Sequence, residues 1–288
     1  MIFVHFFNII RQTWIIPLSY YTNYQVNDEY SVIFVTERSQ NITVKVNTSN
    51  SMPIKFNKDS QGYYIVNYPV EDWQKWIDLL QRPQAMTALK LTAQDYSQLL
   101  YDAFLLAGTN LLPYNISLAL TSLLSANEMF SVWYTGSTVF SQLWPFFRTN
   151  HTVGTHSLMQ TVFRRYAQLL VNNNYRKYGL QSGDPESIVS QRLRSQVSSF
   201  ACAYGLDLCL LEAQVEFKKW RFLNKTLSPN IRATVFRYAI QESKDSSDWH
   251  YLWTTYINVI QTSFKLDCLQ GLAQTSNKDF LKLYVFFI

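Results

Sequence analysis

The hydrophobic period of the chain changes at one short segment, Gly62–Tyr68, and this change constrains the fold more than any other feature. The residues before it are rich in β-branched and turn-forming types, and Gly62–Tyr68 has the composition of a half-buried strand. Pro69 cannot donate to a strand ladder and ends that strand. Apolar residues then recur at helical spacing: Trp73, Trp76, Ile77 and Leu80. The sequence therefore predicts a last strand that leads directly into an all-helical region, with Asp72 as the N-terminal cap of its first helix.

Residues 14–70 are expected to form a small antiparallel β-sandwich, because short strands alternate with turn residues. The strands are expected at Trp14–Leu18, Tyr30–Val35, Ile42–Val46, Pro53–Phe56 and Tyr63–Tyr68. Pro17 suits an edge strand, and the turn-forming Asn57–Gly62 predicts a hairpin between the last two strands. No strand is expected before Trp14. By this interpretation the sandwich is incomplete, and residues 1–13 form an atypical N-terminal segment.

Residues 71–288 predict a mainly α fold, an irregular, HEAT-like α-solenoid of antiparallel helix pairs. Each apolar stripe is interpreted as core packing, including the stripe Leu158, Val162, Tyr166, Leu169 and Leu170. Gly108 is expected to end a helix, Pro113 to lie in a first helical turn, and Pro145 to kink or end a helix.

Composition and charge exclude several classes of protein. The chain has 288 residues, 48% hydrophobic and 16% charged, which is typical of a globular chain. Its net charge is +5, but the basic residues are scattered in short pairs such as Arg164-Arg165 and Lys218-Lys219, so no nucleic-acid partner is indicated. The longest apolar runs, Ile2–Ile10 and Leu283–Ile288, are shorter than the roughly 20 residues of a membrane span. Met1–Ile10 also lacks the basic start and cleavage site of a signal peptide.

Five N-x-[ST] triplets favour the secretory route, although each alone is a weak signal. The candidate glycosylation sites are Asn41, Asn47, Asn115, Asn150 and Asn224. We therefore expect the extracellular face of the plasma membrane or the secretory pathway as the location. Three cysteines fit that setting if two of them are bridged.

Cys202 and Cys209 can form a bridge only if the chain turns between them. Seven residues along one straight helix would separate their Cα atoms by about 10.5 Å, whereas a disulfide tolerates about 4.4–6.8 Å. Gly205 and Asp207 supply turn chemistry between the two cysteines. A bridge would then join the end of one helix to the start of the next and contribute about 2.5 kcal/mol at most. Two buried free thiols are the alternative.

The sequence contains no visible catalytic apparatus. It lacks H-E-x-x-H, a dinucleotide-binding or phosphate-binding glycine loop, and the G-x-S-x-G elbow. The four histidines are His5, His151, His156 and His250. His151 and His156 flank Gly154 in an expected loop, with no nearby Cys and no carboxylate at metal-ligand spacing. Asp102 and Glu128 are interpreted as charges on helix surfaces. We therefore predict no catalytic residue, no metal ligand and no cofactor in this chain.

Four segments resemble the zinc aminopeptidases of the aminopeptidase N type. Gly62–Tyr68 with Trp73 resembles their G-Y-Y-R-V-N-Y-D…N-W signature, and Gln98–Ala107 resembles their R-x-Q-L-I-D-D-A-F-x-L-A helix. Ala201–Trp220 resembles A-C-x6-C…A…F-x-x-W, and the stretch from Trp249 resembles W-x-x-L-W…K…L-A-x-T. The matching structural residues are Gly62, Tyr63, Tyr64, Asn67, Tyr68, Trp73, Gln98, Asp102, Trp220, Trp249 and Trp253. The resemblance implies that Cys202 pairs with Cys209.

The chain departs from the family pattern at several positions. Ile65, Pro69 and Tyr96 replace motif residues, and Arg237 and Gln274 stand where the family has a second cysteine pair. The family's G-A-M-E-N and H-E-x-x-H motifs do not occur in the chain. We interpret the sequence as the β-sandwich and helical domains of a larger ectoenzyme, truncated at both ends.

The resemblance implies a non-catalytic role within a zinc-dependent aminopeptidase. Its helical domain would cover the zinc site of an upstream catalytic domain, exclude water and shape the access of peptide substrates. The chain alone would then neither hold zinc nor cleave peptides, and a homodimer is compatible with this reading. Two alternatives stay open: a helical-repeat module that binds a peptide or protein, and an ectodomain that has lost catalytic activity.

Overall fold

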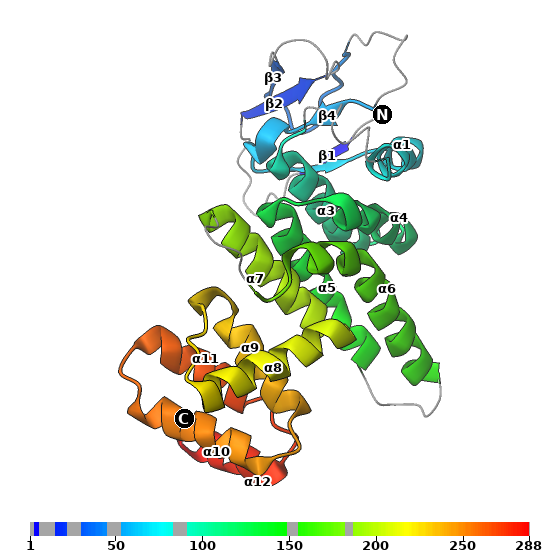
Figure 1. Cartoon of the computed structure of the whole chain (residues 1–288). Coiled ribbons are helices and arrows are strands. Elements are labelled where there is room, and N and C mark those ends of the chain that lie inside the picture. The colour runs from blue at the N-terminus through cyan, green and yellow to red at the C-terminus, as the bar shows by residue number, and fades with distance from the viewer. Residues whose placement is uncertain are drawn as a thin grey trace. The chain divides into compact units, whose positions relative to one another are not determined.

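The computed structural model describes residues 3–5, 15–21, 30–44, 53–82, 91–148, 155–181 and 187–287. The chain divides into two compact units, Met1–Leu143 and Trp144–Ile288, which are described separately (Figure 1). The first unit contains all the described strands together with the first helices. The boundary expected after residue 70, between a β-sandwich domain and a helical domain, stays a prediction.

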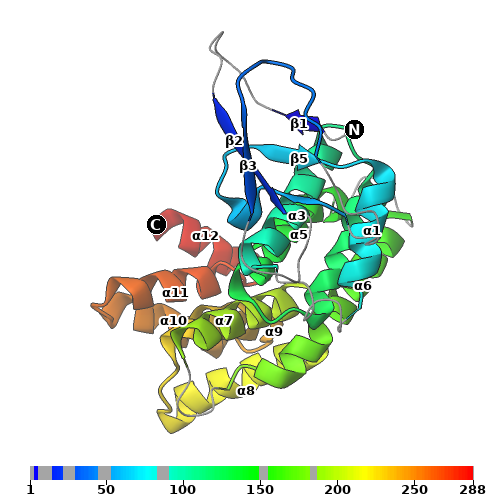
Figure 2. The same cartoon turned by 90° about the horizontal axis from the view of Figure 1, so that it is seen from above.

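The strands of the first unit form two small antiparallel sheets, ordered β3-β2-β4 and β1-β5. Their bounds are β1 Phe3–His5, β2 Ile16–Tyr21, β3 Ser31–Val35, β4 Lys55–Phe56 and β5 Ile65–Asn67. Figure 2 shows β1 beside β5. The expected hairpin is wrong, because β5 pairs with β1 and not with β4. Asn57, Asp59 and Ser60 have positive φ, and the short helix η1 Lys58–Ser60 leads the chain away from β4.

Three further expectations about the strands need correction. A strand does precede Trp14, since β1 lies within residues 1–13. Asn41–Val44 have no strand structure, and Lys45 and Val46 lie outside the described residues. Pro17 lies in the middle strand of its sheet, but β2 pairs with β4 only at Tyr20 and Tyr21. At Pro17 the strand therefore pairs with β3 alone, through Phe34, so the proline breaks no second ladder.

The helices of the first unit follow β5 directly, as the change of period predicts. They are α1 Val70–Leu80, α3 Ala93–Gly108, α4 Tyr114–Leu120, the 3₁₀ helix η2 Thr121–Ala126 and α5 Phe130–Arg148, whose residues from Trp144 on belong to the second unit. Asp72 does not cap α1, because the helix begins at Val70 after Pro69 and Asp72 lies in its first turn, paired with Lys75. Gly108 does end α3, and Pro113 lies one residue before α4. Pro145 lies inside α5 and does not end it.

The second unit is built from consecutive helices that pack in pairs. These are α6 Thr155–Tyr178, α7 Ile188–Ala203, α8 Asp207–Leu223, α9 Pro229–Glu242, α10 Ser246–Asn258, α11 Thr262–Leu272 and α12 Lys278–Phe287. Helix α6 packs on α7, α8 on α9, and α10 on α11, while α9 also packs on α7 and α11. The predicted mainly α class with a small antiparallel β part is confirmed. No helix in the described part of the chain is long and apolar enough to cross a membrane.

The predicted core face of α6 is wrong at three of its five residues, although Leu170 is buried as predicted. Leu158, Val162 and Leu169 are more than half exposed, and the buried face instead contains Phe163 and Ala167. Both faces of the helix carry apolar residues at helical spacing, so the period alone does not choose between them. Packing decides, since the Phe163 ring stacks on Phe147 at 4.4 Å between centroids.

Candidate functional site: a buried polar junction between strands and helix α3

Lys55 of β4 is the centre of a polar cluster inside the first unit. Its ammonium group is fully buried and lies 3.2 Å from a carboxylate oxygen of Asp95, which is fully buried too. The same Nζ donates to the backbone oxygens of Phe56 and Asn57, at 2.7 and 3.2 Å, and to Oε1 of Gln98 at 2.6 Å. Burial lowers the pKa of Lys55, while the nearby carboxylates of Asp95, Asp102 and Asp59 raise it. A buried ammonium is tolerated only where every donor finds an acceptor, and this one does.

Asp95 is held by the start of its own helix. Thr92 is the N-cap of α3 and forms a reciprocal capping box with Asp95, in which each side chain bonds to the backbone of the other. The Asp95 carboxylate also accepts from the backbone amide of Asp59 at 2.9 Å, and the Thr92 hydroxyl donates to the Asp59 carboxylate at 2.8 Å. The loop after β4 is thus fastened to the first turn of α3.

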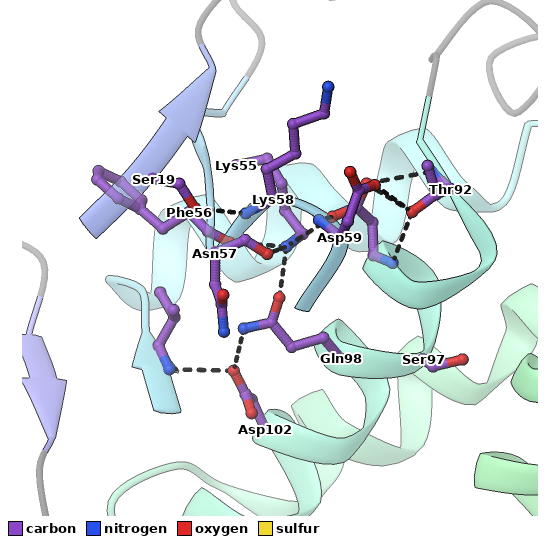
Figure 3. Close-up of polar contacts among 12 residues, drawn as sticks. Ser19, Lys55, Phe56, Asn57, Lys58, Asp59, Thr92, Ser97, Gln98 and Asp102 are labelled. Atoms are coloured by element: carbon purple, nitrogen blue, oxygen red, sulfur yellow. Dashed lines mark hydrogen bonds and ion pairs between the residues drawn. The ribbon is translucent and has the colours of Figure 1, made fainter. Parts of the chain in front are cut away.

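Gln98 and Asp102 extend the cluster along one face of α3 (Figure 3). Gln98 lies between Lys55 and Asp102, because its amide nitrogen donates to the Asp102 carboxylate at 3.1 Å. That carboxylate also accepts from the backbone amide of Val66 in β5 at 3.0 Å. Burial raises the pKa of Asp102 to about 7, against the opposing effects of the Val66 amide, Lys55 and Gln98. The interpretation of Asp102 as a surface charge is therefore wrong, whereas Glu128 is exposed in the turn before α5.

The motif around Gly62 joins the two sheets through hydrogen bonds that its tyrosine hydroxyls accept. The Tyr64 hydroxyl accepts from the Ser19 amide of β2 at 3.3 Å, and the Tyr68 hydroxyl accepts from the Phe56 amide of β4 at 3.2 Å. Alternation along the strand buries Tyr64 and Tyr68 and leaves Tyr63 fully exposed. Tyr63 therefore has no packing role in the described part of the chain.

Glycine is required at position 62 because the Tyr64 ring lies directly on it. A Cβ atom at Gly62 would lie 2.1 Å from Cε1 of Tyr64. Asn57 closes the turn, since its side chain donates to the Gly62 carbonyl and accepts from the Gly62 amide. Asn67 at the end of the motif accepts from the indole nitrogen of Trp73, at 3.1 Å, and so links β5 to α1.

The junction holds the charged groups of Lys55 and Asp95, and the titratable carboxyl of Asp102, in an environment closed to solvent. Lys55, Asp95 and Asp102 are all shielded from solvent, and their contacts link β4, β5 and α3. Because its pKa is raised to about 7, Asp102 can change its protonation near neutral pH. A change there alters an acceptor for Val66 and Gln98 at the strand-to-helix transition.

The remaining predicted residues lie in the second unit. Cys202 and Cys209 form a disulfide, with their Cα atoms 5.3 Å apart, across the turn between α7 and α8. Gly205 in this turn has φ of 76°, a conformation that glycine adopts without strain. Trp249 is buried and donates to the Leu272 carbonyl at 3.1 Å. Trp220 and Trp253 are half-buried in aromatic clusters with Phe236 and Trp249 respectively.

The candidate glycosylation sites differ in their surroundings. Asn41, Asn115 and Asn224 are exposed, and Asn47 and Asn150 lie outside the described residues. Zinc in proteins is bound by three or four His, Cys, Asp or Glu side chains that surround one point. Within the described ranges no three His, Cys, Asp or Glu side chains gather in a group that could hold a metal ion, so those residues do not fit zinc.

Sequence reasoning missed Lys55, Thr92 and Asp95. A signal for two of them is present, because Thr92-x-x-Asp95 before an apolar run is the pattern of a capping box. Lys55 carries no such signal. Its place in a short strand with alternating apolar residues indicates a solvent-facing lysine. Only its contacts with Asp95 and Gln98 of α3, and the packing of α3 against η1, reveal its burial.

Comparisons with known proteins show the family to which most of the chain is similar. Residues 53–288 match the family model described as "ERAP1-like C-terminal domain". Glutamyl aminopeptidase of Rattus norvegicus is 29% identical over 273 residues, which are 95% of this chain and 27% of that protein. The human protein of the same name is 28% identical over 274 residues, with the same two shares. Aminopeptidase N of Plutella xylostella is 25% identical over 270 residues, 92% of this chain and 27% of that protein.

Because the family match covers most of its length, the chain belongs to the family of ERAP1-like C-terminal domains, the C-terminal part of aminopeptidases of the aminopeptidase N type. It spans about 27% of the length of the relatives named here.

Proposed function

We propose that this chain is the non-catalytic C-terminal portion of a zinc-dependent aminopeptidase. Its helical part covers the active site of the catalytic domain of the same enzyme and limits the access of peptide substrates. The observation that carries this proposal is the match of residues 53–288 to a C-terminal domain family, together with relatives that are named aminopeptidases. Exclusion of water by such a cover strengthens electrostatic interactions in the site beneath it.

The first test is the activity of the purified chain. We expect no hydrolysis of aminoacyl amides by the chain alone, with or without added zinc. Zinc-dependent turnover that copurifies with the chain would contradict the proposal.

Reconstitution tests the covering role. The catalytic part of the Rattus norvegicus glutamyl aminopeptidase would be expressed without the region that this chain matches. The added chain is expected to restore part of the peptide hydrolysis, and the rat protein's own C-terminal region serves as the matched positive control. Restoration by that region but not by this chain would count against the proposed role.

The proposed location is the secretory pathway or the extracellular face of the plasma membrane. The supporting observations are the Cys202–Cys209 disulfide, which persists in oxidising compartments, and the exposed Asn41 and Asn224 triplets. Cell fractionation of the native protein, with protease protection in intact vesicles, tests the location. Native protein that is found only in the cytosolic fraction would contradict it.

A peptide-binding module is the second candidate, and one feature of the second unit favours it. Helices α10 and α12 border a hollow of about 500 Å³ lined by Trp249, His250, Trp253, Tyr256, Ile257 and Leu283. Pockets of this size take small ligands, and aromatic-lined grooves bind Pro-rich peptide segments. Titration of the chain with a peptide library, followed by tryptophan fluorescence, is expected to show saturable binding that Trp253→Ala weakens. Absence of saturable binding would remove this candidate.

A further inference from the structure

The C-terminal end of α8 combines an acceptor asparagine with an exposed aromatic ring. Asn224 follows the last residue of α8 and adopts the left-handed conformation, with φ of 53°. Lys225 and Thr226 after it are exposed, so the whole Asn-x-Thr triplet lies at the surface. Phe222, two residues before the asparagine, is 63% exposed. The exposed ring offers an apolar surface within two residues of the asparagine.

Neighbouring contacts hold the turn and the ring in place. The backbone amides of Asn224 and Lys225 both donate to the Lys219 carbonyl, which fixes the turn at the helix end. The Arg221 guanidinium lies over one face of the Phe222 ring, 4.6 Å from its centroid. Arg221 is itself anchored by an ion pair with Asp248. The backbone that carries both Phe222 and Asn224 is therefore fixed.

Among the five triplets, this one alone has an aromatic residue two positions before the asparagine. The corresponding residues at the other four triplets are Ser39, Lys45, Pro113 and Arg148. The triplet at Asn115 differs in structure too, because it lies on helix α4 and its Ser117 hydroxyl is buried and donates to the Ala103 carbonyl at 2.8 Å.

We propose that Asn224 carries an N-linked glycan whose first N-acetylglucosamine packs on the ring of Phe222. The proposal rests on the secretory route proposed above. In the transfer, the amide nitrogen of Asn224 bonds to C1 of the sugar of a lipid-diphosphate-linked oligosaccharide. The bond from C1 to the phosphate oxygen breaks, the lipid diphosphate leaves, and the amide loses one proton. The apolar C–H face of the sugar then covers the negative face of the aromatic ring.

The first experiment asks whether the site is modified. The full chain is secreted from animal cells behind an added signal peptide, which imposes the route, so that this test does not depend on the native location or on aminopeptidase activity. Peptide mass spectrometry after treatment with peptide N-glycosidase is expected to show conversion of Asn224 to Asp. Thr226→Ala keeps the asparagine in its turn and should abolish the conversion. An unmodified Asn224 in the secreted wild-type chain would overturn the proposal.

The second experiment asks whether the ring packs on the sugar. Protein bearing high-mannose glycans is trimmed either to a single N-acetylglucosamine or to no sugar, and the two melting temperatures are compared. The wild-type chain is expected to lose about 2–4 °C on removal of the last sugar. Phe222→Leu keeps an apolar side chain and undergoes the same Asn-to-Asp conversion, but it should lose much less, as should Thr226→Ala. Equal losses in all three proteins would show that the ring and the sugar do not interact.

Discussion

The junction around Lys55 and the turn between α7 and α8 both fasten one element to the next, but they use different chemistry. At the junction, buried charges and backbone groups satisfy one another, and the energy depends on every partner being present. At the turn, the Cys202–Cys209 disulfide restricts the chain covalently and acts mainly on the unfolded state. The junction should therefore respond to pH and to the loss of a single partner, whereas the turn should respond to reductant.

Removal of the Lys55 ammonium should have the largest effect. Lys55→Met keeps the length and apolar stem of the side chain but leaves the Asp95 carboxylate buried without its cation. Breaking a buried pair in this way costs about 3–5 kcal/mol. The free energy of unfolding of the first unit, measured by hydrogen exchange of β5 and α3 amides in urea, is expected to fall by this amount. Lys75→Met, at an exposed pair with Asp72, is the control and should change it by less than about 1 kcal/mol.

Titration of Asp102 should produce the next largest effect. The pKa of Asp102 is raised to about 7, so the folded state holds a proton that the unfolded state releases near pH 4. The stabilisation is therefore complete below about pH 4 and is lost as the pH rises through about 7, a change of a few kcal/mol. Lys55, Gln98, the Val66 amide and Tyr64 are the groups that face this carboxyl. Asp102→Asn should flatten the fall in stability between pH 4 and 8, and an unchanged pH profile would contradict this.

Loss of the disulfide should have an intermediate effect that is confined to the second unit. Chain entropy for so short a loop gives about 2.5 kcal/mol. Reduction, or the double substitution Cys202→Ser and Cys209→Ser, is expected to increase hydrogen exchange at the end of α7 and the start of α8. The β5 and α3 amides serve as the internal reference and should not change. Increased exchange of the β5 and α3 amides after reduction would show that the disulfide also stabilises the junction around Lys55.

Substitution of Gly62 should have the smallest effect of the four. Gly62→Ala places a methyl group 2.1 Å from the Tyr64 ring, which must move and weaken its bond to Ser19. Overpacking of this kind costs about 2 kcal/mol. Gly108→Ala at the end of α3 is the matched control, since the nearest atom to its Cβ would be the Tyr114 hydroxyl at 3.9 Å. Urea midpoints that shift equally for the two variants would refute the role given to the Tyr64 ring.

The change of period at Gly62–Tyr68 was enough to predict the order of strands and helices, because periodicity is a local property of the sequence. The partners of the strands were not predictable in the same way. The pairing of β5 with β1 depends on the backbone turn at Asn57–Ser60, which carries the chain away from β4. The predicted core face of α6 was wrong at Leu158, Val162 and Leu169 because two apolar faces compete there. Only packing, such as the Phe163 ring on Phe147, decides between them.

The residues of the candidate site were also predictable only in part. The motif tyrosines and Gln98 stand out in the sequence by their resemblance to a family, and Thr92-x-x-Asp95 has a local pattern. Nothing in the sequence marks Lys55 and Asp102 as buried, since both residues belong to segments whose polar positions normally face water. Their environment arises only when β4, β5 and α3 come together.

The coupling free energy between Lys55 and Asp95 tests the account of the junction most directly. A double-mutant cycle would compare Lys55→Met, Asp95→Asn and the combined variant by the stability of the first unit. We predict that the combined variant loses less stability than the sum of the two single losses, because changing both residues leaves no unpaired charge buried. Losses that simply add would contradict the claim that this pair joins the strands to helix α3.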